Sequence, residues 1–189
     1  MMQDLIEEVN NCKLCKLCDN VKNRVIGEGN LNAKLVLVGE APGRREDEAG
    51  RPFVGSSGKL LDNILERAGL KREEIYISNV VKCRPPDNRK PTKKEVMACS
   101  VHLEKQLEII KPKIIAPMGN SAVEHVFNLF KLEKMLISGA HGKNFSIDTE
   151  WGKVIIVPLY HPAAAIYNRK LYSNLLVDLV ELKKILRLL

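Results

Sequence analysis

The sequence has no long hydrophobic run, no secretion signal and no internal repeat. Its apolar stretches stay well below the roughly 20 residues that a helix needs to cross a bilayer. Residues 1–11 are acidic and amphipathic, whereas a signal peptide is basic and then apolar. We therefore expect a cytoplasmic protein in a reducing environment, with no membrane partner. Because linkers and low-complexity segments are also missing, the 189 residues (1–189) are expected to form a single domain.

Both glycine-rich fingerprints for phosphate binding are missing as well. Residues 39–43 read Gly-Glu-Ala-Pro-Gly, without the Gly-Lys-Ser/Thr ending of a P-loop and without a G-x-G-x-x-G motif. An ordinary strand-to-helix turn is one interpretation of this segment. The other is a turn whose glycines let backbone amides approach a ligand closely.

Acidic residues are outnumbered by basic ones. The chain has 30 Lys and Arg against 23 Asp and Glu, which gives a formal net charge of +7. This excess favours a polyanionic partner such as nucleic acid. A surface rich in both lysine and glutamate is also typical of thermophile proteins, so charge alone does not assign a function.

Four of the five cysteines form two widely separated pairs. Cys12 and Cys15 have the C-x2-C spacing, and Cys83 and Cys99 follow about seventy residues later, while Cys18 is extra. This pattern predicts four thiolates on one soft metal centre, either zinc or an iron–sulfur cluster. Disulfides fit the close spacing less well, and buried thiols without a function are the remaining alternative.

Short apolar strands alternate with helical patterns along the chain. The predicted strands are residues 34–38, 75–77, 113–118 and 154–157, and a hairpin at Trp151-Gly152 leads into the last. The predicted helices are residues 4–11, 57–68, 92–110, 121–130 and 171–188. Thr92 and Glu95 form a capping box at the third helix. This alternation predicts an α/β fold with a four-stranded parallel sheet and helices on both faces.

Three polar or aromatic side chains stand near predicted strand ends, where such sheets bind ligands. Asn79 has a planar amide that can read the edge of a heterocycle, although asparagine is also a common turn residue. Phe53 follows a charged loop and can stack on a base, although most such residues fill a core. His161 precedes Pro162 at a strand tip, where a structural role is an equal alternative.

Taken together, these motifs resemble those of the family 4 uracil-DNA glycosylases, the iron–sulfur-containing, thermostable type of the uracil-DNA glycosylase superfamily. The resemblance runs from Cys12 to the final helix and rests on motifs in the family's order. These motifs are Cys12-x2-Cys15, Gly-Glu-Ala-Pro-Gly (39–43), Gly-Arg-Pro-Phe-Val-Gly (50–55), Asn-Val-Val-Lys-Cys-Arg-Pro-Pro (79–86) and Tyr-His-Pro-Ala-Ala-Ala (160–165). The resemblance implies a 4Fe–4S cluster bound by Cys12, Cys15, Cys83 and Cys99. The α/β domain is therefore expected to include a loop region that holds this iron–sulfur cluster.

The resemblance also implies a reaction and roles for the three side chains. Such enzymes flip deoxyuridine out of DNA and hydrolyse its N-glycosidic bond, which releases uracil and leaves an abasic site for base excision repair. By resemblance, His161 donates to the uracil O2 as negative charge develops there. Asn79 reads the Watson–Crick edge of the base, and Phe53 stacks on its ring.

The turn at residues 39–43 has a further implied role. The resemblance places Glu40, Ala41 and Pro42 along the uracil pocket, where they help to place water. Ala41 stands where other uracil-DNA glycosylase families have an aspartate that orients water, so Glu40 becomes the candidate catalytic residue for that task. Gly43 supplies no bulk against the thymine methyl group.

The resemblance also implies that the segment after Pro162 enters the DNA duplex. In the superfamily this loop fills the space that the flipped nucleotide leaves. Its alanines are too small for that, so Tyr167 is predicted to be the wedge, supported by Ile166, with Arg169 near the phosphates. The alternative is that Tyr167 packs under the closing helix.

The sequence alone leaves two rival functions open. A non-catalytic iron–sulfur protein that binds DNA or senses redox state would need the cysteines but not Phe53, Asn79 and His161. A family 5 glycosylase would have an apolar residue in place of Glu40. We therefore expect a monomeric glycosylase whose partners are uracil-containing DNA, single- or double-stranded, and the product uracil.

Overall fold

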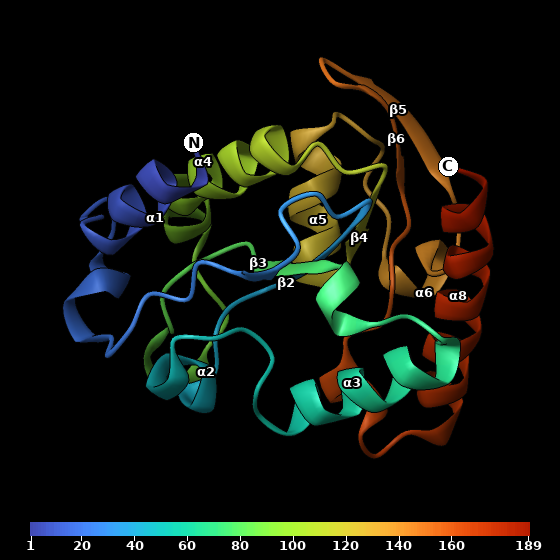
Figure 1. Ribbon diagram of the computed structural model, residues 1–189. Coiled ribbons are helices and arrows are strands. Elements are labelled where there is room, and N and C mark those ends of the chain that lie inside the picture. Colours follow the sequence, from blue (N-terminus) through green and yellow to red (C-terminus); the bar gives the residue numbers. More distant parts are fainter.

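The computed structural model describes the whole chain, residues 1–189, and is built around one mixed sheet of six strands in the order β1-β3-β2-β4-β6-β5 (Figure 1). The strands are β1 (Glu28–Gly29), β2 (Leu35–Gly39), β3 (Tyr76–Asn79), β4 (Ile114–Pro117), β5 (Phe145–Thr149) and β6 (Gly152–Ile156). The central four, β3, β2, β4 and β6, are parallel. β1 and β5 add antiparallel edges.

The four predicted strands are confirmed as this parallel centre, but the sheet is two strands wider than predicted. β1 has only two residues, which is too short for any periodic pattern. β5 reads Phe-Ser-Ile-Asp-Thr with no buried residue, so it lacks the continuous apolar character of the central strands. It pairs with β6 in the hairpin predicted at Trp151 and Gly152. Edge strands are easily missed because tertiary pairing rather than composition defines them.

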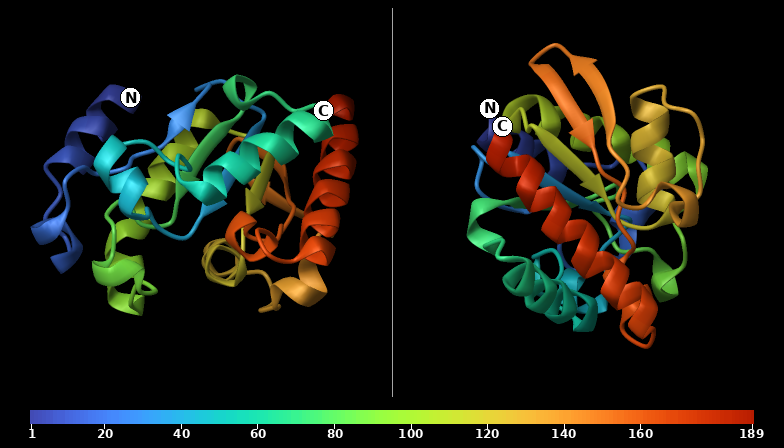
Figure 2. Two further views of the ribbon diagram at one scale, coloured as in Figure 1. Left: turned by 90° about the horizontal axis from the view of Figure 1, so that it is seen from below. Right: turned by 90° about the vertical axis from the view of Figure 1, so that its right-hand side faces the viewer.

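The two faces of the sheet are covered by different helices. α1 (Met2–Asn10), α4 (Lys93–Ile110) and α5 (Asn120–Leu129) cover one face, and α3 (Ser56–Ala68) and α8 (Arg169–Leu188) cover the other (Figures 1 and 2). Alternate residues of β2 face opposite ways: Val36 packs with the first group and Leu37 with the second. Burial on both faces explains why every residue of β2 is buried and why this strand reads as an apolar run.

Shorter elements connect these layers. They are α2 (Arg44–Ala49), α6 (Ile137–Ala140), α7 (Pro162–Ala165) and the 3₁₀ turns Lys16–Asn20, Arg72–Glu74 and Pro86–Asn88. The helix predicted at residues 57–68 begins one residue earlier and ends at Gly69, whose φ of 71° closes it. No helix of the structure has both the length and the apolar character of a membrane span.

The predicted capping box of α4 is present. Thr92 Oγ1 accepts from the Glu95 amide at 3.3 Å, and the Thr92 amide donates to Glu95 Oε2 at 2.7 Å. The Arg89 guanidinium, 2.7 Å from Glu95 Oε1, is the main cause that lowers the pKa of Glu95 to about 2. The start of α4 is therefore fixed, and with it the helical turn that carries Cys99.

Candidate active site and cysteine cluster

A cavity of about 630 Å³ lies where the parallel strands end. Each central strand is followed by residues that line this cavity, as expected for the carboxyl edge of a parallel sheet. The structure brings together all six residues predicted to bind uracil, namely Glu40, Ala41, Pro42, Phe53, Asn79 and His161. Residues from four separate parts of the sequence therefore share one space.

Phe53 occupies an unusual backbone conformation in this cavity. Its φ is 51°, in the left-handed region that non-glycine residues rarely adopt, and its side chain is buried. Its ring lies 5.7 Å, centre to centre, from the ring of His161. A strained residue of this kind persists only where its surroundings hold it, and such residues are frequent in ligand sites.

Glu46 and Arg72 hold the loop that carries Phe53. Glu46 Oε1 accepts from the amides of Val54 and Gly55 at 2.9 and 2.7 Å. Arg72 donates to the carbonyls of Pro52 and Phe53 at 2.7 and 3.3 Å. The charge-assisted bonds on both sides of Phe53 stabilise its conformation. Sequence reasoning missed both residues, because neither lies beside Phe53 in the sequence.

Gly39 allows the close approach that the site needs. A Cβ at this position would lie 2.3 Å from Asn79 Oδ1 and 2.7 Å from Phe53 Cζ. Either distance is a clash, so only glycine leaves room for the aromatic ring and the amide together. The first glycine of the motif at residues 39–43 therefore gives the side chains of Asn79 and Phe53 room beside the strand.

Asn79 presents an unsatisfied amide to the cavity. The residue ends β3, pairs in register with Gly39 and is 2% exposed. Its side-chain oxygen Oδ1 is buried and has no hydrogen-bond partner in the protein. Buried polar atoms are almost always paired, so an orphaned acceptor on a cavity wall indicates a ligand that donates to it.

His161 is held as a neutral donor. Its Nδ1 accepts from the amide of Ala163 at 3.1 Å, so in the neutral ring the hydrogen must be on Nε2. Burial lowers the pKa of His161, while the negative charges of Glu40 and Glu46 oppose that shift. The imidazole therefore offers one N–H without carrying a charge.

Sequence reasoning also missed the part of the wall beyond the end of β4. Gly119 and Asn120 line the cavity, and a Cβ on Gly119 would approach His161 Cβ to 3.0 Å. Asn120 Oδ1 accepts from the Ile137 amide at 2.9 Å and so ties α5 to α6. Their position in the sequence could have indicated this role. Gly119 and Asn120 come directly after the predicted strand at 113–118, and Asn79 likewise stands at the end of a predicted strand.

The five cysteines gather around a second, much smaller cavity of about 10 Å³. Cys12, Cys15 and Cys18 come from the N-terminal segment, Cys83 from the turn after β3, and Cys99 from α4. All five are unbridged, so the disulfide interpretation is wrong for this structure. Three distant segments therefore line one cavity, and the sharing of a metal centre by four of the thiols stays a prediction.

Hydrogen bonds around this second cavity distinguish the five thiols. The Lys82 amide donates to Cys99 Sγ at 3.3 Å, and His102 Nε2 lies 3.3 Å from Cys12 Sγ. Cys18 Sγ instead donates outward to Asp19 at 3.4 Å. Burial raises the pKa of Cys83 to about 12, so as a free thiol this group is neutral.

Comparison with known proteins identifies the family. The model of the Uracil DNA glycosylase superfamily matches residues 26–182. A type-4 uracil-DNA glycosylase of Archaeoglobus fulgidus is 47% identical over 171 residues, covering 90% of this chain and 85% of the relative. Another, of Sulfurisphaera tokodaii, is 42% identical over 185 residues, covering 97% and 84%. The chain belongs to the type-4 uracil-DNA glycosylases.

The type-5 alternative matches far less of the chain. A type-5 uracil-DNA glycosylase of Pyrobaculum aerophilum is 34% identical over 116 residues, which cover 53% of this chain and 51% of the relative. The distinction between the two types, predicted from Glu40, is therefore confirmed. Membership of a glycosylase family also argues against the non-catalytic iron–sulfur protein.

In the type-4 family an iron–sulfur cluster is expected, and the cysteine cavity fits that chemistry. No three His, Cys, Asp or Glu side chains are placed to hold a single metal ion. Thiolates alone line this cavity as candidate ligands apart from His102, and cysteine thiolates are the usual ligands of iron–sulfur clusters. Soft thiolates in largely apolar surroundings are typical ligands of such a cluster.

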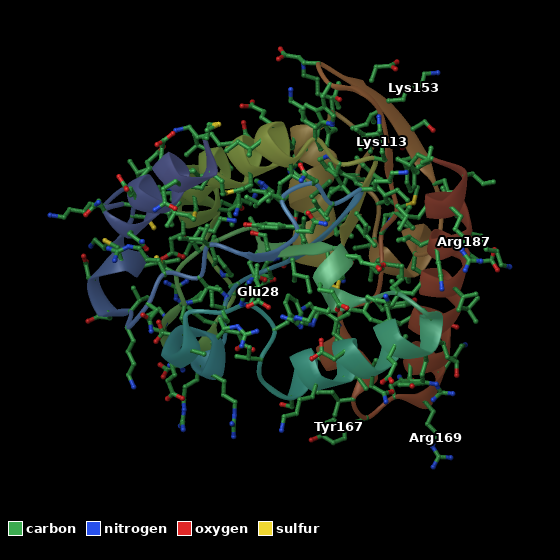
Figure 3. The ribbon with its side chains drawn as sticks, viewed as in Figure 1. Glu28, Lys113, Lys153, Tyr167, Arg169 and Arg187 are labelled. Carbon is green, nitrogen blue, oxygen red and sulfur yellow. The ribbon has the colours of Figure 1, made fainter.

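The predicted wedge of this type-4 enzyme lies on the surface between α7 and α8. Tyr167 is 97% exposed, so the alternative in which it packs under the closing helix is wrong. Ile166 is half-buried and Arg169 is exposed. Tyr167 and Arg169 project from the same end of the molecule (Figure 3).

Proposed function

We propose that this type-4 enzyme takes deoxyuridine out of DNA and hydrolyses its N-glycosidic bond in the strand-end cavity. The observation that carries the proposal is the meeting of Phe53, Asn79 and His161 around that cavity. Together they supply a stacking surface, an edge-reading amide and a neutral donor. Uracil leaves as an anion, so a preorganised donor assists the reaction more than a strong nucleophile would.

Asn79 selects uracil by the pattern of its edge. The unpartnered Oδ1 accepts from uracil N3–H, and Nδ2 donates to O4. Cytosine presents an acceptor at N3 and a donor at its exocyclic amine, which reverses both contacts. Each unpaired buried group costs about 1–3 kcal/mol, so cytosine is rejected.

His161 stabilises the departing base. Its Nε2–H donates to uracil O2, where negative charge grows as the glycosidic bond breaks. A neutral imidazole fits this role because it gives the hydrogen bond without needing a proton from solvent. The lowered pKa of His161 supports the neutral form at physiological pH.

The remaining wall residues position the base and the attacking water. Phe53 stacks on the uracil ring, and the backbone of Ala41 and Pro42 borders it. Glu40 is the proposed water-orienting residue, since its carboxylate lies near enough to His161 to affect the titration of the imidazole. A carboxylate there can accept a hydrogen bond from the water that attacks the sugar.

Cys12, Cys15, Cys83 and Cys99 are proposed to hold a 4Fe–4S cluster. Cys18 is left out because its thiol bonds outward to Asp19. The cluster would join the N-terminal segment, the turn after β3 and helix α4, and hydrolysis of the glycosidic bond requires no electron transfer. Its proposed role is therefore to stabilise the fold.

Tyr167, Ile166 and Arg169 are proposed to engage DNA. The exposure of Tyr167 leaves its ring free to enter the duplex, and Arg169 can meet a phosphate. We extend the proposal to one domain of residues 1–189 that acts as a monomer in the cytoplasm, where thiols stay reduced.

The decisive experiment compares oligonucleotides that are identical except for one uracil in place of thymine. Incubation with enzyme purified without oxygen, followed by alkali, should cleave only the uracil strand. A mock preparation from cells that carry the empty vector, purified in the same way, controls for a contaminating glycosylase. If the iron-loaded enzyme binds uracil-DNA without cleaving it, the binding-protein alternative replaces this proposal.

A further inference from the structure

Residues 79–83 connect the strand-end cavity to the cysteine cavity. Asn79 lines the first, and Cys83 lines the second, four residues further along. Lys82, between them, is 1% exposed and is one of the largest fully buried side chains in the molecule. Lysine is seldom buried without partners, so the position of this side chain requires an explanation.

The terminal nitrogen of Lys82 lies among three acceptors. Nζ is 2.7 Å from the carbonyl oxygen of Asn79, 2.8 Å from Ser78 Oγ and 2.6 Å from Gln106 Oε1. These match the three N–H groups of an ammonium. Gln106 belongs to α4 and Ser78 to β3, so one side chain joins the sheet to the helix that carries Cys99.

The backbone of Asn79 sets where its amide points. Oδ1 has no partner in the protein, so no hydrogen bond to that oxygen restrains the side chain before a base arrives. Main-chain bonds anchor the next two residues, because the Val80 amide donates to the Gly39 carbonyl at 2.9 Å and the Val81 amide donates to the Glu40 carbonyl at 3.1 Å. Lys82 then binds the carbonyl of Asn79 itself.

We propose that Lys82 is a positioning residue for base recognition. From inside the core its terminal nitrogen fixes the peptide of Asn79, while its own amide, bonded to Cys99 Sγ, anchors the same segment at the cysteine cavity. The edge-reading amide is thereby held in register with Phe53 and His161. This inference rests on the proposed function, because it assigns Lys82 a task within uracil recognition.

A double-mutant cycle tests the assignment. Lys82→Met removes the three donors but keeps the length of the side chain and the backbone amide that bonds Cys99. If Lys82 acts through Asn79, Lys82→Met should lower the single-turnover rate on uracil about tenfold or more, but by less than about threefold in an Asn79→Ala background. Iron content should stay at the wild-type level in both proteins.

A matched control separates positioning from general destabilisation. Leu179→Ala removes a fully buried side chain of α8 on the other side of the sheet. Its effect on the rate should be the same in the wild-type and Asn79→Ala backgrounds. Equal losses for Lys82→Met in the two backgrounds, or no loss in the first, would overturn the assignment.

A second variant keeps the test possible if Lys82→Met does not fold. Gln106→Leu takes away the acceptor at 2.6 Å and leaves Lys82 in place. It should give a smaller loss of rate that again depends on Asn79, and a loss independent of Asn79 would contradict the proposal. The proposed function and the role of Lys82 can fail separately. A wild-type enzyme that never cleaves uracil-DNA refutes the function. An active enzyme in which the effects of Lys82→Met and Asn79→Ala on the rate simply add refutes only the role of Lys82.

Discussion

The strand-end cavity and the cysteine cavity are joined by five residues of chain, yet they are built differently. The first has about 630 Å³, and the second about 10 Å³. The first is shaped by strand ends and by loops that Glu46 and Arg72 tie with charge-assisted bonds. The second brings together side chains from an irregular segment, a turn and a helix, with few hydrogen bonds to the thiols.

The geometry of each cavity therefore has a different origin. Regular backbone pairing places the ends of neighbouring strands within a few ångströms, so the strand-end cavity follows from the sheet. The segment that carries Cys12 and Cys15 has no such pairing with the sheet. Its position depends instead on side-chain packing, because Leu5, Val9 and Leu17 are buried against the helices on that face of the sheet.

The largest expected effect is at the cysteine cavity. Cys83→Ser should lose the iron and most of the folded yield, because metal binding free energy is folding free energy in such sites. Iron and acid-labile sulfide analysis, with visible absorption, measures the first, and soluble yield the second. Cys18→Ser is the matched control and should keep about four irons per chain. One zinc and no sulfide in anaerobically purified wild type would contradict the cluster.

At the strand-end cavity, His161→Ala should keep the fold and the iron but lose rate. Removal of one preorganised donor costs on the order of a hundredfold or more. The loss should appear in single-turnover cleavage and hardly in DNA affinity, because the charge on the base develops only in the transition state. His125→Ala, on the neighbouring helix α5, should leave the rate nearly unchanged. Weak binding with normal cleavage would make His161 a binding group.

Asn79→Asp is expected to change selectivity more than stability. The carboxylate keeps an acceptor for N3–H but loses the donor to O4, so uracil loses its advantage over cytosine. The discrimination should fall by about 1–3 kcal/mol, or roughly 5- to 150-fold. Competition between uracil and cytosine oligonucleotides measures this ratio. Unchanged discrimination in a folded variant would place base reading elsewhere in the cavity.

Tyr167→Ala tests whether an exposed side chain outside the strand-end cavity inserts into the DNA duplex. A side chain that is 97% exposed contributes little to folding, so the melting temperature should not change. Loss of stacking should weaken duplex binding by about 1–3 kcal/mol and lower activity more on paired uracil than on single strands. Equal losses on both substrates would show that the wedge lies elsewhere.

The smallest expected effect concerns pH. Burial lowers the pKa of His161, and in the proposed function the neutral ring is the active form. Activity should therefore be present above that pKa and fall only when the pH drops through it, below the ordinary value of about 6.5. Glu40 raises the pKa of His161, so Glu40→Gln should move the acid limb of the normalised rate profile to lower pH. A shift to higher pH would contradict this arrangement.

Much of this architecture could be predicted from local patterns. The apolar runs gave the four parallel strands, and the Thr92–Glu95 pair gave the start of α4. Once parallel strands are assigned, the meeting of Asn79 and His161 is expected, because their carboxyl ends share one edge. The C-x2-C spacing likewise predicted that the cysteines converge.

Sequence patterns did not extend to interactions between distant segments. β1 and β5 exist because a neighbouring strand offers backbone partners, and neither has a composition that marks it. Arg72 reaches the carbonyl of Phe53 across 19 positions, and Lys82 reaches Gln106 across 24. Hydrogen bonds between such distant residues depend on how the helices pack on the sheet, and a local sequence pattern does not predict that packing.

Local patterns were enough to single out Asn79 and His161 as candidate residues and to place them after predicted strands, because strand period and turn residues are local properties. The way in which the candidate residues are held depends on the packed fold. That fold placed Phe53 in a left-handed conformation, put the hydrogen of neutral His161 on Nε2 and left Asn79 Oδ1 without a partner. The reason is that the orientation of a side chain is fixed by its contacts, and these contacts come from segments brought together only by folding.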